Sequence, residues 1–543
     1  MELRKCFESD FLNADEFEAI GLCYQELRYY IPDVDVSFAL KAMDRPRRIS
    51  GQIGMERLNA LRENLCRVAQ NSQMRQGSDF FALASELLSM LQHFEYPDDM
   101  EQKECIGIGL YYLLTALDEY VKLGLQRAEE YGEANKISPL NHGKSLESCQ
   151  VHWNKNNSFL SGAYKPGKAG FRTPLTACEL GDMFQSFQII ETVSLAQFRQ
   201  KMQPNIIRVP LCTTSRDAIQ KKKMIRIASI PFIGFDTFGF HEVDSEFPCP
   251  PEKEPEGEFY IEYPQEEENS IRLVVSLVDL AIEQGANLIV LPEFVISPRM
   301  RKAIAKCLYE KRKTSQVILV FAGTTYEWDP STQKGNNVLH ILNNRGKEVG
   351  TYYKYSRFLT KLQGGFHEAV GEMPKEEVTA GLVFKHMERL SDPGKICTLF
   401  DVEKIGRILP AVCRDIVDGK YTSGLVNLFR PNIVLAPAWS RSVVSFDTFL
   451  KQYANTTHTA SLLCNCCNAV SVSQPPHEGE KETGRFCIPR KEKSAMDAKI
   501  QPISRPAECL VRCREQGGCV VFIDVDFSAG IPVAQVERPI HPQ

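Results

Sequence analysis

The stretch "RILPAVCRDIVDG", residues 407–419, places a cysteine between an apolar run and two charged residues. The apolar side chains of 408–412 predict a buried strand, and Cys413 is followed at once by Arg414 and Asp415. A buried cysteine is usually inert, whereas a cysteine that ends a strand beside charged groups is a candidate nucleophile. This stretch therefore predicts a sheet that presents a reactive thiol at its edge.

Two other predicted strands also end on a reactive side chain. "LIVLPE", residues 288–293, ends on Glu293, and "TYYKYSRF", residues 351–358, carries Lys354 just after a hairpin strand. Neighbouring strands that end in this way bring the three side chains to one edge of a sheet. Such a set is sufficient for acyl transfer, because the thiol attacks a carbon, the carboxylate moves its proton and the ammonium stabilises the oxyanion.

Strands alternate with helices and hairpins around these motifs, which predicts an α/β domain over about 224–528. The pattern predicts helices at 270–284 and 298–313, and strands at 225–232, 288–291, 317–321, 396–400, 406–412, 432–436, 468–473 and 518–525. Two polar segments, about 241–270 and about 474–508, are expected to be exposed insertions. The first holds eleven acidic residues and one lysine, Lys253, a composition too charged to bury.

The first part of the chain, 1–215, is expected to be a separate and mainly helical domain of unknown role. Apolar residues recur at intervals of three and four in 56–75, 80–91 and 101–131, as on one face of a helix. A chain of 543 residues is also too long for one ordinary core.

Composition excludes several classes of protein. A net charge of −5 and a pI near 6.1 argue against binding of nucleic acid by the whole chain. No apolar run reaches the ~18 residues of a membrane span, and the N-terminus lacks the apolar region of a signal peptide. Eighteen cysteines without such a signal indicate reduced thiols in a cytoplasmic protein. The late cysteines are interpreted as residues of strands and sheet edges, and neither a metal nor a cofactor is expected.

Four stretches together resemble the nitrilase superfamily of carbon–nitrogen hydrolases, and they occur in the family's order over some 300 residues. They are "AIEQGANLIVLPE" (281–293), "GNNVLHILNNRGKEVGTYYKY" (335–355), "GRILPAVCRD" (406–415) and "FRPNIVLAPAWS" (429–440). The resemblance implies a four-layer α-β-β-α sandwich over 224–528. It also implies Glu293 as general base, Lys354 as oxyanion stabiliser and Cys413 as nucleophile.

The resemblance implies further site residues. The backbone N–H of Arg414 would complete the oxyanion hole, and Trp439 lines the pocket or packs beneath it. The family often carries a second glutamate between the lysine and the cysteine, for which Glu368 is the candidate and Glu372 the alternative.

The resemblance also implies a substrate and a partner. Asp415, in "CRD" where related amidases have Cys-Tyr-Asp, favours amides over nitriles. The leading hypothesis is a thiol amidohydrolase that cleaves a non-peptide C–N bond of a small amide through a thioester. Members commonly pair through two helices, here expected at roughly 414–430 and 441–462, so a homodimer or larger homo-oligomer is expected. The alternative is a regulated or non-catalytic effector, as in bacterial defence systems, with 1–215 as its sensor or partner-binding module.

Overall fold

The structure of the protein is a computed structural model, in which the chain divides into two compact units, Met1–Gln197 and Phe198–Gln543. It describes residues 3, 5–14, 16–31, 52–74, 80–98, 100–130, 152–153, 159–163, 187–191, 203–222, 224–232, 239–242, 257–331, 334–357, 359–363, 383–390, 396–402, 405–418, 422–429, 431–440, 442–457, 459–467, 481–489, 498–505, 518–526 and 533–541. Among these residues, no helix is long and apolar enough to cross a membrane.

The first unit is built on helices, as the spacing of its apolar residues predicts. Its helices are α1 (Lys5–Leu12), α2 (Glu16–Tyr30), α4 (Gln52–Met74), α5 (Phe80–Gln92) and α6 (Gln102–Glu130). The predicted stripe of α5, including Leu83, Leu87 and Leu91, is buried in one apolar cluster with residues of the other four. Three short strands, β1 (His152–Trp153), β2 (Phe159–Ala163) and β3 (Phe187–Glu191), form a separate antiparallel sheet.

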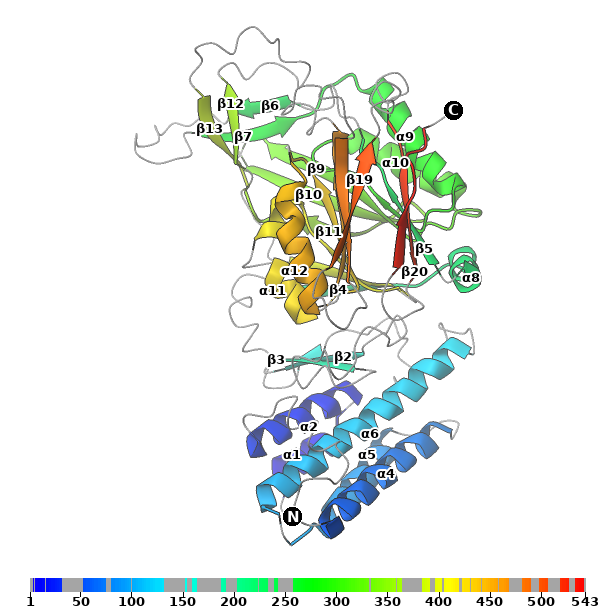
Figure 1. Ribbon diagram of the computed structural model, residues 1–543, viewed down its shortest axis with the longest axis vertical. Coiled ribbons are helices and arrows are strands. Elements are labelled where there is room, and N and C mark those ends of the chain that lie inside the picture. The colour runs from blue at the N-terminus through cyan, green and yellow to red at the C-terminus, as the bar shows by residue number, and fades with distance from the viewer. Residues whose placement is uncertain are drawn as a thin grey trace. The chain divides into compact units, whose positions relative to one another are not determined.

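The second unit contains two seven-stranded sheets (Figure 1). The first sheet has the order β11 (Glu348–Tyr353), β10 (Lys334–Asn343), β9 (Leu319–Asp329), β8 (Leu288–Val290), β5 (Met224–Ser229), β20 (Val521–Asp526) and β21 (Val533–Val536). The second has the order β19 (Lys499–Arg505), β18 (Lys481–Ile488), β17 (Ala460–Asn465), β16 (Ile433–Ala438), β15 (Gly406–Pro410), β14 (Ile396–Val402) and β4 (Gln203–Val209).

The two sheets pack face to face, with helices outside each. Phe321 of β9 and Phe400 of β14 meet with ring centroids 6.1 Å apart. Outside the first sheet lie α9 (Glu268–Glu283) and α10 (Pro298–Lys311), and outside the second lie α11 (Thr422–Phe429) and α12 (Asp447–Thr457) (Figure 1). The helix α8 (Thr213–Lys222) precedes β5. The predicted α-β-β-α fold class is therefore confirmed.

The second unit also contains a four-stranded sheet, and one of its strands lies where the sequence predicted an exposed insertion. Its order is β12 (Leu359–Gln363), β13 (Val383–Glu388), β7 (Gly257–Glu262) and β6 (Gly239–Glu242). The strand β7 lies in the acidic segment that was expected to be exposed, and its Phe259 and Ile261 are buried. Phe259 and Ile261 are two residues apart and so share the face of the strand that packs in the core, a pattern that the total charge of the segment conceals.

The predicted limits of the two domains also need correction. The strand β4 falls within 1–215, yet it pairs in parallel with β14 of the sandwich, and β21, beyond residue 528, pairs with β20. Within the expected 474–508 insertion, β18 and β19 extend the second sheet. The polar Arg485 of β18 is buried there because Asp447 and Glu482 pair with its guanidinium.

The elements after Cys413 are shorter than expected. In place of one helix over 414–430 there is a 3₁₀ turn, η4 (Cys413–Val417), followed by α11. The short turn η5 (Val444–Phe446) and α12 replace the helix expected over 441–462, and β17 begins at Ala460. The strand expected at 468–473 lies outside the described residues.

Candidate active site

Glu293 is delivered by the loop that follows β8 of the first sheet. Its side chain is buried, and the next residue, Phe294, has a positive φ of 67°. Such a backbone is strained for a residue other than glycine. It is held in place because the N–H of Phe294 donates to Thr324 Oγ1 at 2.8 Å and its ring is fully buried. The Glu293 carboxylate thereby reaches the second sheet, where the N–H of Trp439, the residue after β16, contacts it.

Lys354 follows the last residue of β11 and is held by its neighbouring strand, where its N–H donates to the carbonyl of Asn337 at 3.0 Å. Its ammonium lies 2.7 Å from Glu293 Oε1 and 2.6 Å from Glu388 Oε2. All three side chains are almost completely excluded from solvent. An isolated charge would be very unfavourable here, so each group depends on the others.

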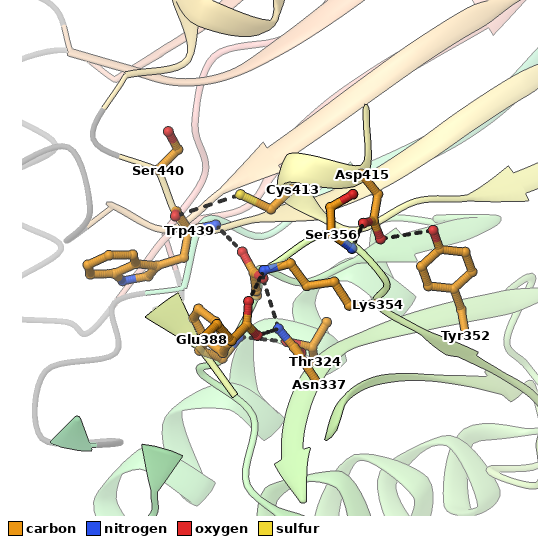
Figure 2. A network of polar contacts seen from close by, with 12 residues as sticks. Thr324, Asn337, Tyr352, Lys354, Ser356, Glu388, Cys413, Asp415, Trp439 and Ser440 are labelled. Atoms are coloured by element: carbon orange, nitrogen blue, oxygen red, sulfur yellow. Dashed lines mark hydrogen bonds and ion pairs between the residues drawn. The ribbon is translucent and has the colours of Figure 1, made fainter. Parts of the chain in front are cut away.

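Cys413 comes from the second sheet, just beyond β15, and is the first residue of η4. It has a positive φ of 45° and is 2% exposed. Its thiol contacts the carbonyl oxygen of Trp439 at 3.8 Å, while the N–H of Trp439 donates to Glu293 Oε2 at 3.0 Å. The backbone of one residue, Trp439, therefore touches both the thiol and the carboxylate (Figure 2).

The structure thus brings Glu293, Lys354 and Cys413 together from the ends of three strands, as the sequence predicts. It also adds two residues that the sequence analysis missed. Glu388, at the end of β13, is buried against Lys354. Asn337 of β10 donates from Nδ2 to Glu293 Oε1 and to Glu388 Oε1, both at 2.9 Å. Both residues lie in strands. Burial of their polar side chains marks them as site residues, and a single sequence without an alignment does not show that burial.

The remaining predicted residues have different surroundings. Asp415 is buried and accepts hydrogen bonds from Tyr352 Oη at 2.9 Å and from the N–H of Ser356 at 2.7 Å. Both of its oxygens therefore accept hydrogen bonds from protein groups. The side chain of Arg414 is exposed.

Trp439 contributes its backbone to the site, and its ring packs on Phe294 with centroids 6.5 Å apart. Glu368 and Glu372 both lie outside the described residues. The carboxylate that lies on Lys354 between the lysine and the cysteine in sequence is that of Glu388.

Burial and charge decide the protonation of the site. Burial, followed by the negative charge of Glu293, raises the pKa of the Cys413 thiol well above its usual value. Burial opposes the charge of Lys354, but Glu293 and Glu388 outweigh it and raise its pKa. Burial also raises the pKa of Glu388, against the attraction of Lys354. At neutral pH the sulfur is therefore a thiol beside an ammonium, and it needs a base before it can attack.

No cation site accompanies these residues. Within the described ranges, no group of three or more His, Cys, Asp or Glu side chains has a geometry that could hold a metal ion. Two of the late cysteines, Cys464 and Cys466, instead contact the carbonyls of Val290 and Phe232 at 3.3 and 3.1 Å.

Comparison with known proteins gives matches at the level of structure. No family model and no curated protein matches the chain. Nit3 of Saccharomyces cerevisiae, a member of branch 10 of the nitrilase superfamily, matches with 15% identity and a TM-score of 0.33, over 54% of this chain and 93% of that one. An amidase from Nesterenkonia sp. matches with 12% identity and a TM-score of 0.32, over 54% and 94%.

A third match is partial on both sides. A glutamine-dependent NAD(+) synthetase from Cytophaga hutchinsonii has 12% identity and a TM-score of 0.27, over 52% of this chain and 43% of that one.

Proposed function

We propose that the second unit is a thiol-dependent amidohydrolase that cleaves a non-peptide C–N bond of a small amide. The observation that carries this proposal is the buried ion pair of Lys354 with Glu293 beside the Cys413 thiol. The backbone of Trp439 contacts both the Glu293 carboxylate and the thiol. A base, a cation and a nucleophile in one buried place are the groups that acyl transfer requires.

The reaction begins when Glu293 takes the proton of the Cys413 thiol and the thiolate attacks the carbonyl carbon. The ammonium of Lys354 stabilises the oxyanion that forms, an effect that is strong in a buried site. Collapse of this intermediate breaks the C–N bond, and protonated Glu293 returns the proton to the leaving amine. Water then attacks the thioester with Glu293 again as base, which releases the acid and restores the thiol.

Other groups near the three reactive side chains fit this scheme in supporting roles. Glu388 accepts from Lys354 and from Asn337, which favours a role in holding the cation. The N–H of Arg414 is proposed as a second oxyanion donor. Asp415 two residues after the nucleophile favours an amide over a nitrile. The acyl transfer itself needs no cofactor.

Intact-mass spectrometry after incubation with a panel of small amides tests the function. An acyl adduct that maps to Cys413 and is absent from Cys413→Ala supports the proposal. Hydrolysis of any of these amides by Cys413→Ala at the wild-type rate contradicts it. A reduced thiol is required throughout, which also favours the cytoplasm as the location.

A homodimer through α11 and α12 is proposed on the family resemblance. One feature of this surface supports it, since Val444, just before α12, is 56% exposed. Light scattering at micromolar concentration checks the assembly, and a monomer there contradicts it.

The alternative function is an effector in which the helical unit recognises a partner or signal. It is favoured by the separate apolar core of α1–α6, which makes this unit a module of its own. Full cellular function of Cys413→Ala would support the alternative, and its loss supports the enzyme.

A further inference from the structure

We infer that Asn337 is a positioning residue that locks the carboxylate of Glu293 so that Oε2, and not Oε1, takes the proton of the Cys413 thiol. This inference rests on the proposed function, because it concerns how the general base is aimed. Asn337 touches neither the sulfur nor a substrate, and it acts through the two glutamates.

The first step is the occupancy of the two oxygens of Glu293. Oε1 accepts from Lys354 Nζ at 2.7 Å and from Asn337 Nδ2 at 2.9 Å. Oε2 accepts from the N–H of Trp439 at 3.0 Å. A carboxylate oxygen has two lone pairs. Two strong donors therefore fill Oε1, while Oε2 retains capacity for the thiol proton.

The second step is the side on which the thiol lies. The sulfur of Cys413 contacts the carbonyl oxygen of Trp439, and Oε2 of Glu293 contacts the N–H of the same residue. Oε2 is therefore the oxygen held on the thiol's side, and Oε1 is held by Lys354 and Asn337. Rotation of the Glu293 carboxylate would break three hydrogen bonds at once.

The third step is the way in which Asn337 relates the two glutamates. Its Nδ2 carries two hydrogens, and each points to a different carboxylate, Glu293 Oε1 and Glu388 Oε1. Two like charges side by side repel each other. The amide bridges them without adding a charge, so it fixes their geometry while Lys354 supplies the neutralisation.

The fourth step is that Asn337 is poorly satisfied as a structural residue. It is completely buried, and its Oδ1 has no hydrogen-bond partner among the residues that the structure describes. A buried acceptor without a partner destabilises the fold and calls for a functional explanation. Asn337 donates to two carboxylates although its own acceptor has no partner in the described part of the chain. This combination fits a role in orienting the Glu293 carboxylate.

The test measures alkylation of Cys413 by iodoacetamide in the full chain, mapped by peptide mass spectrometry. In this reaction the sulfur bonds to the methylene carbon, iodide leaves, and the thiol proton passes to Glu293. Asn337→Leu removes the donor at similar volume, and Asn337→Asp replaces it with an oxygen. The matched controls are Asn336→Leu and Asn336→Asp, because residue 336 is on the same strand but is only half-buried.

Both Asn337 variants are expected to slow alkylation of Cys413 by ~10- to 100-fold, the range for loss of a hydrogen bond to a charged group. Their rate–pH profiles are expected to move to higher pH, because a carboxylate that loses a donor is less stable in its charged form. The charged groups that face this amide are Lys354, Glu388 and Glu293, with Asp415 beyond Lys354. A merely structural role would leave the profile in place.

The outcomes separate the inference from the function on which it rests. Wild-type alkylation in Asn337→Leu, while Glu293→Gln is slowed, overturns the inference alone. Wild-type alkylation in Glu293→Gln overturns the base and the inference together. Equal slowing in the Asn336 controls also overturns the inference. Near-UV circular dichroism checks folding, and if both Asn337 variants unfold, Asn337→Ser is measured, since its hydroxyl cannot reach both carboxylates.

Discussion

Two clusters in the second unit have the same composition, one cation and two carboxylates, but very different surroundings. The inner triad is Lys354 with Glu293 and Glu388, and the side chains are at most 1% exposed. The outer triad is Arg226 with Asp524 and Glu537, whose side chains are 17–31% exposed. The same combination of charges therefore occurs once in a buried site and once at a partly exposed sheet surface.

The difference teaches what each cluster can do. In the outer triad Arg226 donates to both oxygens of Asp524, at 2.8 and 2.6 Å, directly across the strands β5 and β20. Solvent screens this ion pair, and its role is to link the two neighbouring strands. In the inner triad, desolvation makes any unpaired charge very unfavourable. The same desolvation strengthens the field that acts on a reacting group, which suits catalysis.

Loss of the base gives the largest expected contrast between the triads. Glu293→Gln is expected to lower turnover of an active amide by ~10²–10⁴-fold, because the thiol loses its proton acceptor. Asp524→Asn, the same change in the outer triad, is expected to leave turnover within about twofold of wild type, since no reacting group is near it. Steady-state kinetics on both variants checks this, and equal losses would remove the distinction.

Loss of the cation is the next contrast, and it concerns stability. Lys354→Met is expected to lower the free energy of unfolding by about 3–5 kcal/mol at neutral pH, because two buried carboxylates lose their partner. Arg226→Met is expected to lower it by only about 1 kcal/mol, because solvent screens the outer triad. Urea unfolding compares the variants. The deficit of Lys354→Met is expected to shrink at acid pH, where a carboxylate is protonated, and a pH-independent deficit would contradict this explanation.

The second carboxylate of each triad gives a smaller contrast. Glu388→Gln is expected to lower turnover by ~10- to 100-fold, because Lys354 and Asn337 each lose a charged acceptor. Glu537→Gln at the outer triad is its control and is expected to turn over at the wild-type rate. If Glu388→Gln keeps full activity while Glu293→Gln does not, Glu388 has no share in the site.

The smallest expected effect belongs to Asp415, a buried carboxyl beside the inner triad. Burial raises its pKa to about 7, against the opposing charge of Lys354. A raised pKa means that the stability contributed by protonated Asp415 is fully present below its unfolded pKa of about 4 and is lost as the pH rises through about 7.

The free energy of unfolding of the wild type, relative to Asp415→Asn, is therefore expected to fall between about pH 4 and pH 7. Denaturant titrations at several pH values measure this difference. A constant difference would show that Asp415 does not titrate in this range.

Much of the site could be predicted because its residues end strands. Glu293, Lys354 and Cys413 each follow an apolar run, and such runs mark buried strands in the sequence itself. Glu388 and Asn337 were missed because neither follows an apolar run, since Glu388 comes after "KHM" and Asn337 after "KGN". Their partners are distant in sequence, as with Lys354 and Glu388, so no local pattern indicates the contact.

The same reasoning explains where the fold was predicted and where it was not. The spacing of apolar residues was enough for α4, α5 and α6 of the first unit and for α9 and α10, because one buried face determines each helix. Composition failed for β7, β18 and β19, whose polar residues made their segments look exposed. Arg485 shows the reason, since its charge is buried only because Asp447 and Glu482 meet it there.

The sequence by itself determined an α/β domain, the helical unit and three reactive side chains at strand ends, because hydrophobic periodicity and local motifs follow from neighbouring residues. The four-layer sandwich was implied by the resemblance of those motifs to a known family. Only the tertiary structure decided that Glu388 and Asn337 contact the inner triad, that Asp415 is buried with both oxygens hydrogen-bonded, and that the acidic and polar segments contribute strands. The physical reason is that burial of a charge depends on partners that folding brings from far along the chain.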